Sequence, residues 1–196
     1  DQEGIKQGTG VLLGTTNRDL TQGAPQISGA SLDMYIDGDG YFSVQSANGT
    51  VMYTRNGAFA VSVEGDGNYL VNANGDYVMD ENRARIKLPD KAAEIAVNED
   101  GSLWAGGAQF AKLGIVTFTN RNGLMTAGEG NFVETAASGA PEGSSARVVQ
   151  GGLESSNVDL ALEMSRLIRA QKAFSMASRA VSTWDEMEAT TNNLRT

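Results

Sequence analysis

The residue types that most often perform catalysis are missing from this chain. Its 196 residues include no histidine and no cysteine, which removes the commonest general base, the commonest metal ligand and the thiolate nucleophile. The sequence also has neither a Gly-x-Ser-x-Gly segment nor a Gly-x-x-x-x-Gly-Lys-Ser/Thr segment, the signatures of hydrolase nucleophiles and phosphate-binding loops. Ser-His-Asp and papain-like catalysis are therefore excluded, and no cofactor is expected.

Carboxylates are the reactive groups that remain. A pair of them could serve a glycosidase, but here they lie mostly in turns such as Asp37–Gly40 and Glu64–Gly67, where local hydrogen bonding explains them. These turns resemble fragments of calcium loops without completing the ligand pattern. In a dinucleotide-binding fingerprint a helix follows the glycines, whereas a strand is expected after Asp39-Gly40. Tyr41 and Trp104 could stack on a sugar or a base, but aromatic residues in β runs are usually core. We therefore expect turn chemistry and no metal site.

Charge and hydropathy limit the partners of the chain. The net charge is −9, with 40% hydrophobic and 20% charged residues, as in an ordinary globular protein. From Ser155 onward acidic and basic residues balance, so the whole negative charge falls on the preceding body. An acidic body argues against a nucleic-acid partner. The sequence has no run of about 18 apolar residues, so no membrane span is expected.

Turn signals recur about every ten residues through the middle of the chain. Between them lie short aromatic or β-branched runs, with no helix-length stretch. The segment Leu32–Gln45, with Asp37–Gly40 at its centre, is predicted to form a β-hairpin. We predict a mainly β fold, with an antiparallel β domain of hairpins, sandwich-like or barrel-like, over residues 29–150. Residues 1–28 are expected to form an extended connector with a possible short strand at Thr9–Leu13, and residues 151–196 a long C-terminal helix.

The tail from Ser155 is the part with a helical period. All 24 glycines and all three prolines lie at or before Gly152, so the tail lacks both helix breakers. Its start has candidate caps in Ser156 or Asn157, and Asp159 three residues after Ser156 resembles a capping box. The apolar residues recur mostly three, four or seven apart, the spacing of one helix face: Leu160, Met164, Leu167, Ile168, Phe174, Ala177, Val181, Trp184, Met187 and Leu194.

Such a helix needs a partner. From Asn157 to Leu194 it would be about 57 Å long, beyond the roughly 30 Å width of a small domain. No other segment of the chain has the same length and period, so the partner is expected to lie outside these residues. The alternative is that the helix packs along the β domain, which it would overhang. Pairing with other helices is favoured.

Four segments resemble the axial proteins of the bacterial flagellum, the rod and hook subunits. Leu32–Gln45 looks like the family's leucine-aspartate, glycine-aspartate-glycine-phenylalanine-phenylalanine segment, and Tyr53–Phe59 is similar to its tyrosine-threonine-arginine, glycine, phenylalanine motif. Phe118–Pro141 resembles the family's phenylalanine-threonine-asparagine, glycine-leucine stretch, which ends in a small-residue loop. Gly151–Phe174 is the most specific match. The matches follow the family's order over nearly the whole chain.

The resemblance implies an exported building block without a cleavable signal peptide, located outside the cytoplasm in the flagellar basal body. Its β domain would lie on the outside of a tube, with N- and C-terminal helices paired along the inner wall. The partners would be other copies of the chain and neighbouring rod or hook proteins. The N-terminal helical segment is expected to be missing from these residues. Within the family, a single modest β domain favours a subunit of the distal part of the rod, with the hook subunit and the proximal-rod relatives as alternatives.

Two functions of other classes stay open. One is an enzyme or binding domain that acts on cell-wall glycan, which only the acidic turns favour. The other is a secreted adhesin with a trimeric coiled-coil stalk. We interpret the helix stripe as following 3.6 residues more closely than a strict heptad, which argues against that stalk.

Overall fold

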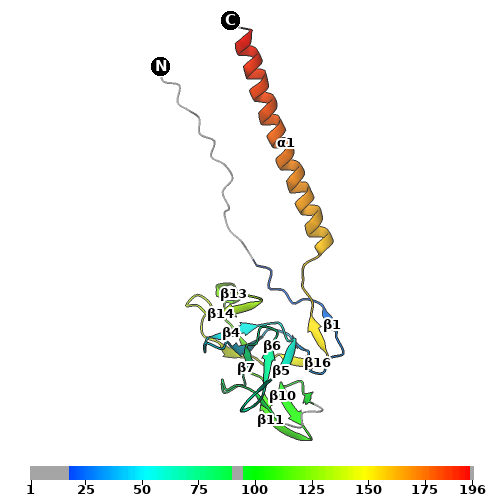
Figure 1. The fold of residues 1–196 in the computed structure, drawn as a ribbon, viewed down its shortest axis with the longest axis vertical. Coiled ribbons are helices and arrows are strands. Elements are labelled where there is room, and N and C mark those ends of the chain that lie inside the picture. Colours follow the sequence, from blue (N-terminus) through cyan, green and yellow to red (C-terminus); the bar gives the residue numbers. More distant parts are fainter. Residues whose placement is uncertain (1–17, 90–94, 195–196) are drawn as a thin grey trace. The chain divides into compact units, whose positions relative to one another are not determined.

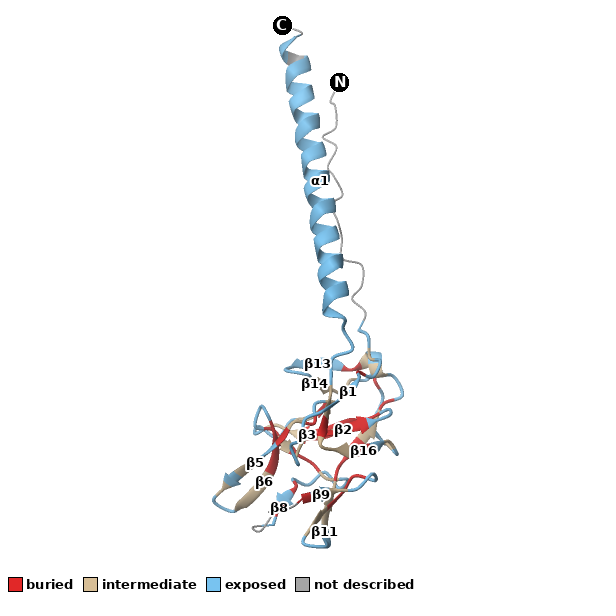
Figure 2. Ribbon diagram, turned by 90° about the vertical axis from the view of Figure 1, so that its right-hand side faces the viewer, coloured by how far each residue is buried: buried red, intermediate tan, exposed pale blue. Residues whose placement is uncertain are grey.

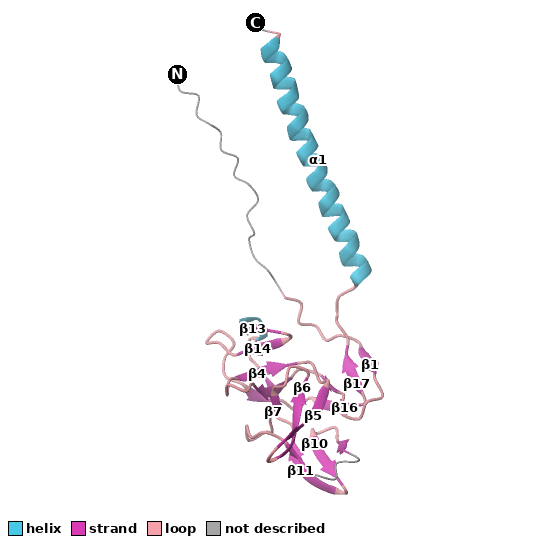
Figure 3. Ribbon diagram, viewed as in Figure 1, coloured by secondary structure: helices cyan, strands magenta, loops and turns pink. Residues whose placement is uncertain are grey.

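The computed structural model describes residues 18–89 and 95–194. It is an antiparallel β body followed by one long helix, as predicted, and the strands form open sheets without a closed barrel in the described ranges (Figures 1 and 3). Of the described residues, those up to 156 form one compact unit and those from 157 to 194 another. The predicted strand at Thr9–Leu13 lies outside the described residues.

The strands are short, as expected for runs closed by Gly, Asn and Asp turns. The first half of the body holds β1 (Pro25–Ile27), β2 (Met34–Asp37), β3 (Tyr41–Gln45), β4 (Val51–Thr54), β5 (Phe59–Glu64), β6 (Gly67–Asn72), β7 (Tyr77–Val78), β8 (Lys87–Leu88) and β9 (Ile95–Val97). The second half holds β10 (Ser102–Ala105), β11 (Ala108–Lys112), β12 (Ile115–Thr117), β13 (Met125–Gly128), β14 (Asn131–Val133), β15 (Glu142–Gly143), β16 (Arg147–Gln150) and β17 (Gly152–Glu154). The helices are the 3₁₀ turn η1 (Arg121–Gly123) and α1 (Leu160–Asn193).

The largest sheet has ten strands, with β13-β14-β4-β3-β7-β6-β5 in order and β12, β15 and β8 attached at its sides. A three-stranded sheet β11-β10-β9 and two ribbons, β1-β17 and β16-β2, complete the body. The predicted turn at Glu64–Gly67 does close a hairpin, since β5 pairs with β6 from Phe59 opposite Asn72 to Glu64 opposite Gly67.

The hairpin predicted over Leu32–Gln45 is wrong. β2 pairs with β16, Met34 opposite Gln150, whereas β3 pairs with β4, β7 and β12. The chain leaves β2 through Gly38, whose φ of +115° suits glycine. The Arg55 guanidinium donates to the carbonyl oxygens of Gly38 (2.9 Å) and Gly40 (2.8 Å). The turn residues are those of a hairpin, but the two strands they join belong to different sheets.

Strand β3 separates two apolar clusters. Successive side chains of a strand point to opposite faces, and both faces of β3 are covered: Phe42 and Val44 belong to the main core, while Tyr41 belongs to a second cluster. In the second cluster the Phe118 ring meets Tyr53 edge to face, with centroids 4.9 Å apart. Figure 2 shows the buried residues gathered around β2 and β3. Tyr41 is therefore a core residue and not a platform for a sugar.

Candidate assembly site

The described start of α1 is fixed by Asp159. Its carboxylate accepts hydrogen bonds from the amides of Ala161 (2.9 Å) and Leu162 (3.1 Å), which satisfies donors that a helix N-terminus leaves without a partner. The helix begins at Leu160, three residues later than the predicted start at Asn157. Three residues were predicted for the cap: Ser156, Asn157 and Asp159. Asp159 is the one that makes these contacts with Ala161 and Leu162.

All ten predicted stripe residues are exposed in the chain. The exposed fractions of the large ones range from 51% for Ile168 to 83% for Leu194, and Phe174 reaches 78%. Figure 2 shows α1 as exposed along its whole length. Isolated exposed apolar residues are ordinary, but this many of them along one helix mark it as an interaction surface.

The ten residues do not share one side of α1. Leu160 and Met187 are 27 positions apart in the sequence, about seven and a half turns at 3.6 residues per turn, so they face opposite directions. Two series at intervals of seven include six of the ten residues, together with two alanines. The main stripe is Leu160, Leu167, Phe174 and Val181, and the second stripe is Ala173, Ala180, Met187 and Leu194. A helix that is apolar on two sides requires neighbours on both.

Five hydroxyl side chains along α1 form hydrogen bonds within the helix. Ser165, Ser182, Thr183, Thr190 and Thr191 each donate to the carbonyl oxygen four residues earlier, at 2.8 to 3.2 Å. This geometry is the usual one for Ser and Thr inside helices. Each of these donors is therefore satisfied without water or a neighbouring chain.

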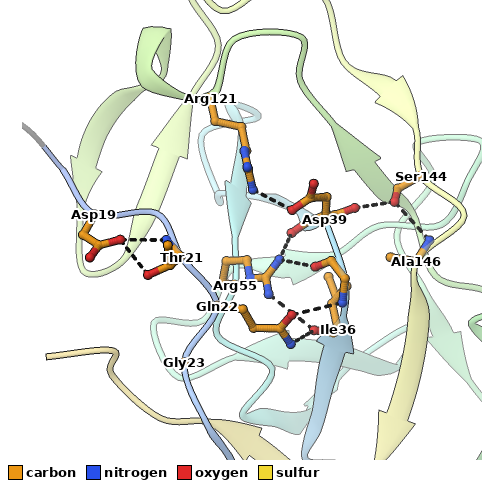
Figure 4. Close-up of polar contacts among 12 residues, drawn as sticks. Asp19, Thr21, Gln22, Gly23, Ile36, Asp39, Arg55, Arg121, Ser144 and Ala146 are labelled. Carbon is orange, nitrogen blue, oxygen red and sulfur yellow. Dashed lines mark hydrogen bonds and ion pairs between the residues drawn. The ribbon is translucent and has the colours of Figure 1, made fainter.

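A second group of polar residues joins the entry and exit of the β body, and we call Gln22, Gly23, Arg55 and Glu154 the chain-end cluster. Arg55 donates through Nε (2.9 Å) and Nη2 (2.7 Å) to Oε2 of Glu154. The other carboxylate oxygen of Glu154 accepts the amide of Gly23 at 2.9 Å. Figure 4 shows Arg55 and Gln22 both directed at the backbone around Ile36. One carboxylate thus connects the entering chain to an arginine on the body.

The carboxylates of the β body support turns and ion pairs. A cavity of about 570 Å³ is lined by Asp80 and Asp100, among other residues. Asp80 accepts the amides of Asn82 (2.8 Å) and Ala84 (2.7 Å). Asp100 accepts the hydroxyl of Ser102 at 2.6 Å, and this bond lowers the pKa of the Asp100 carboxyl below its ordinary value. A raised pKa, the usual mark of a catalytic acid, is the opposite of what Asp100 has.

Within 18–89 and 95–194, no group of three or more acidic residues lies close enough together to hold a metal ion. In the same ranges no helix is long and apolar enough to cross a membrane.

Comparison with known proteins places this arrangement in a family. Residues 35–105 match the flagellar hook protein FlgE/F/G D1 domain, and residues 149–194 match the C-terminal domain of flagellar basal body rod FlgEFG proteins. The chain is 36% identical to the flagellar basal-body rod protein FlgG of Agrobacterium fabrum over 197 residues, which cover 94% of this chain and 72% of that relative. The chain belongs to the flagellar FlgE/F/G rod and hook protein family.

Other members of the FlgE/F/G family are similar over the same span. The FlgG protein of Bacillus subtilis is 34% identical over 96% of this chain and 74% of its own length. The basal-body rod protein FlgF of Caulobacter vibrioides is 29% identical over 87% of this chain and 68% of its own length. The resemblance found in the four sequence segments is thereby confirmed.

The chain-end cluster is the feature that sequence reasoning missed. Arg55 and Glu154 both lie in the segments that carry the family resemblance, but they are 99 positions apart. Neither charge stands in a run or at a helix spacing. The sequence contains no signal that pairs them.

Proposed function

We propose that this chain is a structural subunit of the flagellar basal-body rod, most similar to the distal rod protein, that polymerises helically through its terminal helices. The observation that carries the proposal is the long helix α1, which exposes apolar residues on two sides. Membership of the FlgE/F/G family supports it, as do curated relatives that are named basal-body rod protein FlgG.

Burial of the stripes supplies the driving force for assembly. Removing apolar surface from water is worth about 25 cal/mol per Å², or about 1.5–3 kcal/mol for one fully buried Leu or Phe. All four residues of the main stripe are more than half exposed in the isolated chain: Leu160, Leu167, Phe174 and Val181. Contacts that join different surfaces of successive subunits build a helical filament whenever the rotation between subunits does not close a ring. A helix with two apolar sides is suited to such contacts.

The partners are accordingly other copies of this chain and the neighbouring rod and hook proteins. In the assembled rod the subunits would transmit torque and enclose the export channel, at the basal body and outside the cytoplasm. Export would take place without a cleavable signal peptide. The role is structural and requires no catalysis, in keeping with the turn-forming use of Asp80 and Asp100.

The test is a charge placed on the main stripe of the full-length protein. Leu167→Asp or Phe174→Asp is expected to prevent polymerisation while the β body stays folded, because an ionised carboxylate cannot be buried without a partner. Lys172→Asp is the matched control, since this position lies outside both stripes and already carries a charge. Polymers are measured by sedimentation and electron microscopy, and folding by circular dichroism. Normal polymers from Leu167→Asp and Phe174→Asp would reject the proposal.

A further inference from the structure

The β1-β17 ribbon is the place where the described chain enters and leaves the β body. Pro25 lies opposite Glu154 and Ile27 opposite Gly152, and the amide of Ser155 donates to Ala24 at 2.9 Å. A two-stranded ribbon is marginally stable by itself. All three residues of β1 are exposed, and Ile27 is 90% exposed. Apolar packing therefore does not hold β1, and polar contacts must.

The chain-end cluster supplies those contacts. Arg55 binds Glu154 through two nitrogens, and Glu154 binds the amide of Gly23 with its second oxygen. Gln22 adds a separate link, since its side chain donates to the carbonyl of Ile36 (2.9 Å) and accepts the amide of Gly38 (3.2 Å). The entering chain is thus attached to the exit strand and to the turn after β2.

Arg55 is the common point of this network. Besides Glu154, it donates to the carbonyls of Ile36 (3.3 Å), Gly38 (2.9 Å) and Gly40 (2.8 Å). The side chains of Arg55 and Glu154 are only 21% and 14% exposed, so solvent weakens this pair less than it weakens a surface ion pair. The planar fork of arginine makes all of these bonds at once, which a lysine ammonium cannot do.

We propose that Arg55 is the positioning residue that fixes where both ends of the chain leave the β body, by holding Glu154, the entering segment at Gly23 and the turn at residues 36–40 in one network. In a subunit that polymerises through its terminal segments, both segments must leave each copy at the same place. This part of the inference rests on the proposed rod function. The positioning itself does not depend on it.

Amide hydrogen exchange on the full-length protein, kept unassembled at low concentration, tests the positioning. Arg55→Lys is expected to speed exchange at Gly23, Gly38 and Ser155 by about ten-fold or more, the change expected for loss of a charge-assisted hydrogen bond. Amides of β3 and β4 are expected to keep their protection. Arg147→Lys is the matched control, because Arg147 pairs with Asp37 at 2.8 Å on the exposed surface, where it is 57% exposed.

Equal exchange in Arg55→Lys and the unchanged protein at those three amides would overturn the inference. An increase of the same size in β3 and β4 would overturn it too, because Arg55 would then act only on overall stability. If Arg55→Lys fails to fold, Glu154→Gln decides, since it keeps the shape of Glu154 and one acceptor while removing its charge. In Glu154→Gln, hydrogen exchange must become faster at the amides of Gly23, Gly38 and Ser155.

Polymerisation separates this inference from the proposed function. Arg55→Lys is expected to polymerise less well than the unchanged protein although its β body is folded. If the unchanged protein does not polymerise, the proposed function fails, and the exchange result still decides the positioning role. If the unchanged protein and Arg55→Lys polymerise equally well with equal exchange, the positioning role fails and the proposed function stands.

Discussion

Gly57 lies where the connection from β4 to β5 passes close to β2, and we predict that Gly57→Ala strongly destabilises the β body. A Cβ at this position would lie 1.7 Å from the carbonyl oxygen of Met34 and 3.1 Å from the Phe42 ring. Real Cβ contacts are essentially never shorter than 3.0 Å, so the two backbones must separate by about 1.3 Å, the difference between 3.0 and 1.7 Å. Met34 and Phe42 are fully buried, and the amide of Met34 donates to Gly57 at 3.1 Å.

The separation weakens that hydrogen bond and loosens the core around Met34. Overpacking of this kind costs about 3 kcal/mol, a large part of a total stability of about 5–15 kcal/mol. Urea unfolding followed by circular dichroism is expected to show a midpoint lowered by about 1 to 3 M. Gly65→Ala is the control, because a Cβ there would have nothing within 4 Å and Gly65 has no left-handed φ; its midpoint should change little. Equal midpoints for the two variants would refute the reasoning.

Two further predictions concern titration and the helix start. Burial, reinforced by the charge and hydrogen bond of Glu134, raises the pKa of Tyr53 from 10.0 to about 12; its contribution to stability is therefore complete below pH 10 and is lost as the pH rises through about 12. Tyr53→Phe is expected to reduce the loss of stability over that window in urea unfolding at several pH values, and equal alkaline slopes would contradict this. Asp159→Ala is expected to cost the helix about 1 kcal/mol through loss of its cap, seen as lower helicity by circular dichroism, whereas Asp185→Ala, which removes the same charge within α1, should not lower it.

The predictions from sequence were confirmed where a signal is local. The composition change after Gly152 located the helix, and the turn at Glu64–Gly67 located the β5-β6 hairpin. The turn at Asp37–Gly40 has the same local signal but joins strands of different sheets. Whether this turn closes a hairpin depends on residues far away in the sequence. β16 (Arg147–Gln150) pairs with β2, and Arg55 binds the turn. Local turn chemistry determines where the chain bends. It does not determine which strands pair on either side of the bend.

For the candidate site, the sequence predicted which apolar residues of α1 are exposed. It did not predict that they belong to two stripes on different sides of the helix. Counting at intervals of three, four and seven placed Leu160 and Met187 on one face, although they face opposite directions in a helix. The chain-end cluster was not predicted, because Arg55 and Glu154 come together only when the whole body is folded.

The internally bonded hydroxyls of α1 bear on what surrounds it after association. Ser182, Thr183, Thr190 and Thr191 keep their protons occupied by the helix's own backbone. Desolvating an unpaired hydroxyl is costly, but these side chains present mainly methyl and methylene groups outward. A neighbouring helix can therefore cover these four side chains without providing acceptors for their hydroxyl protons.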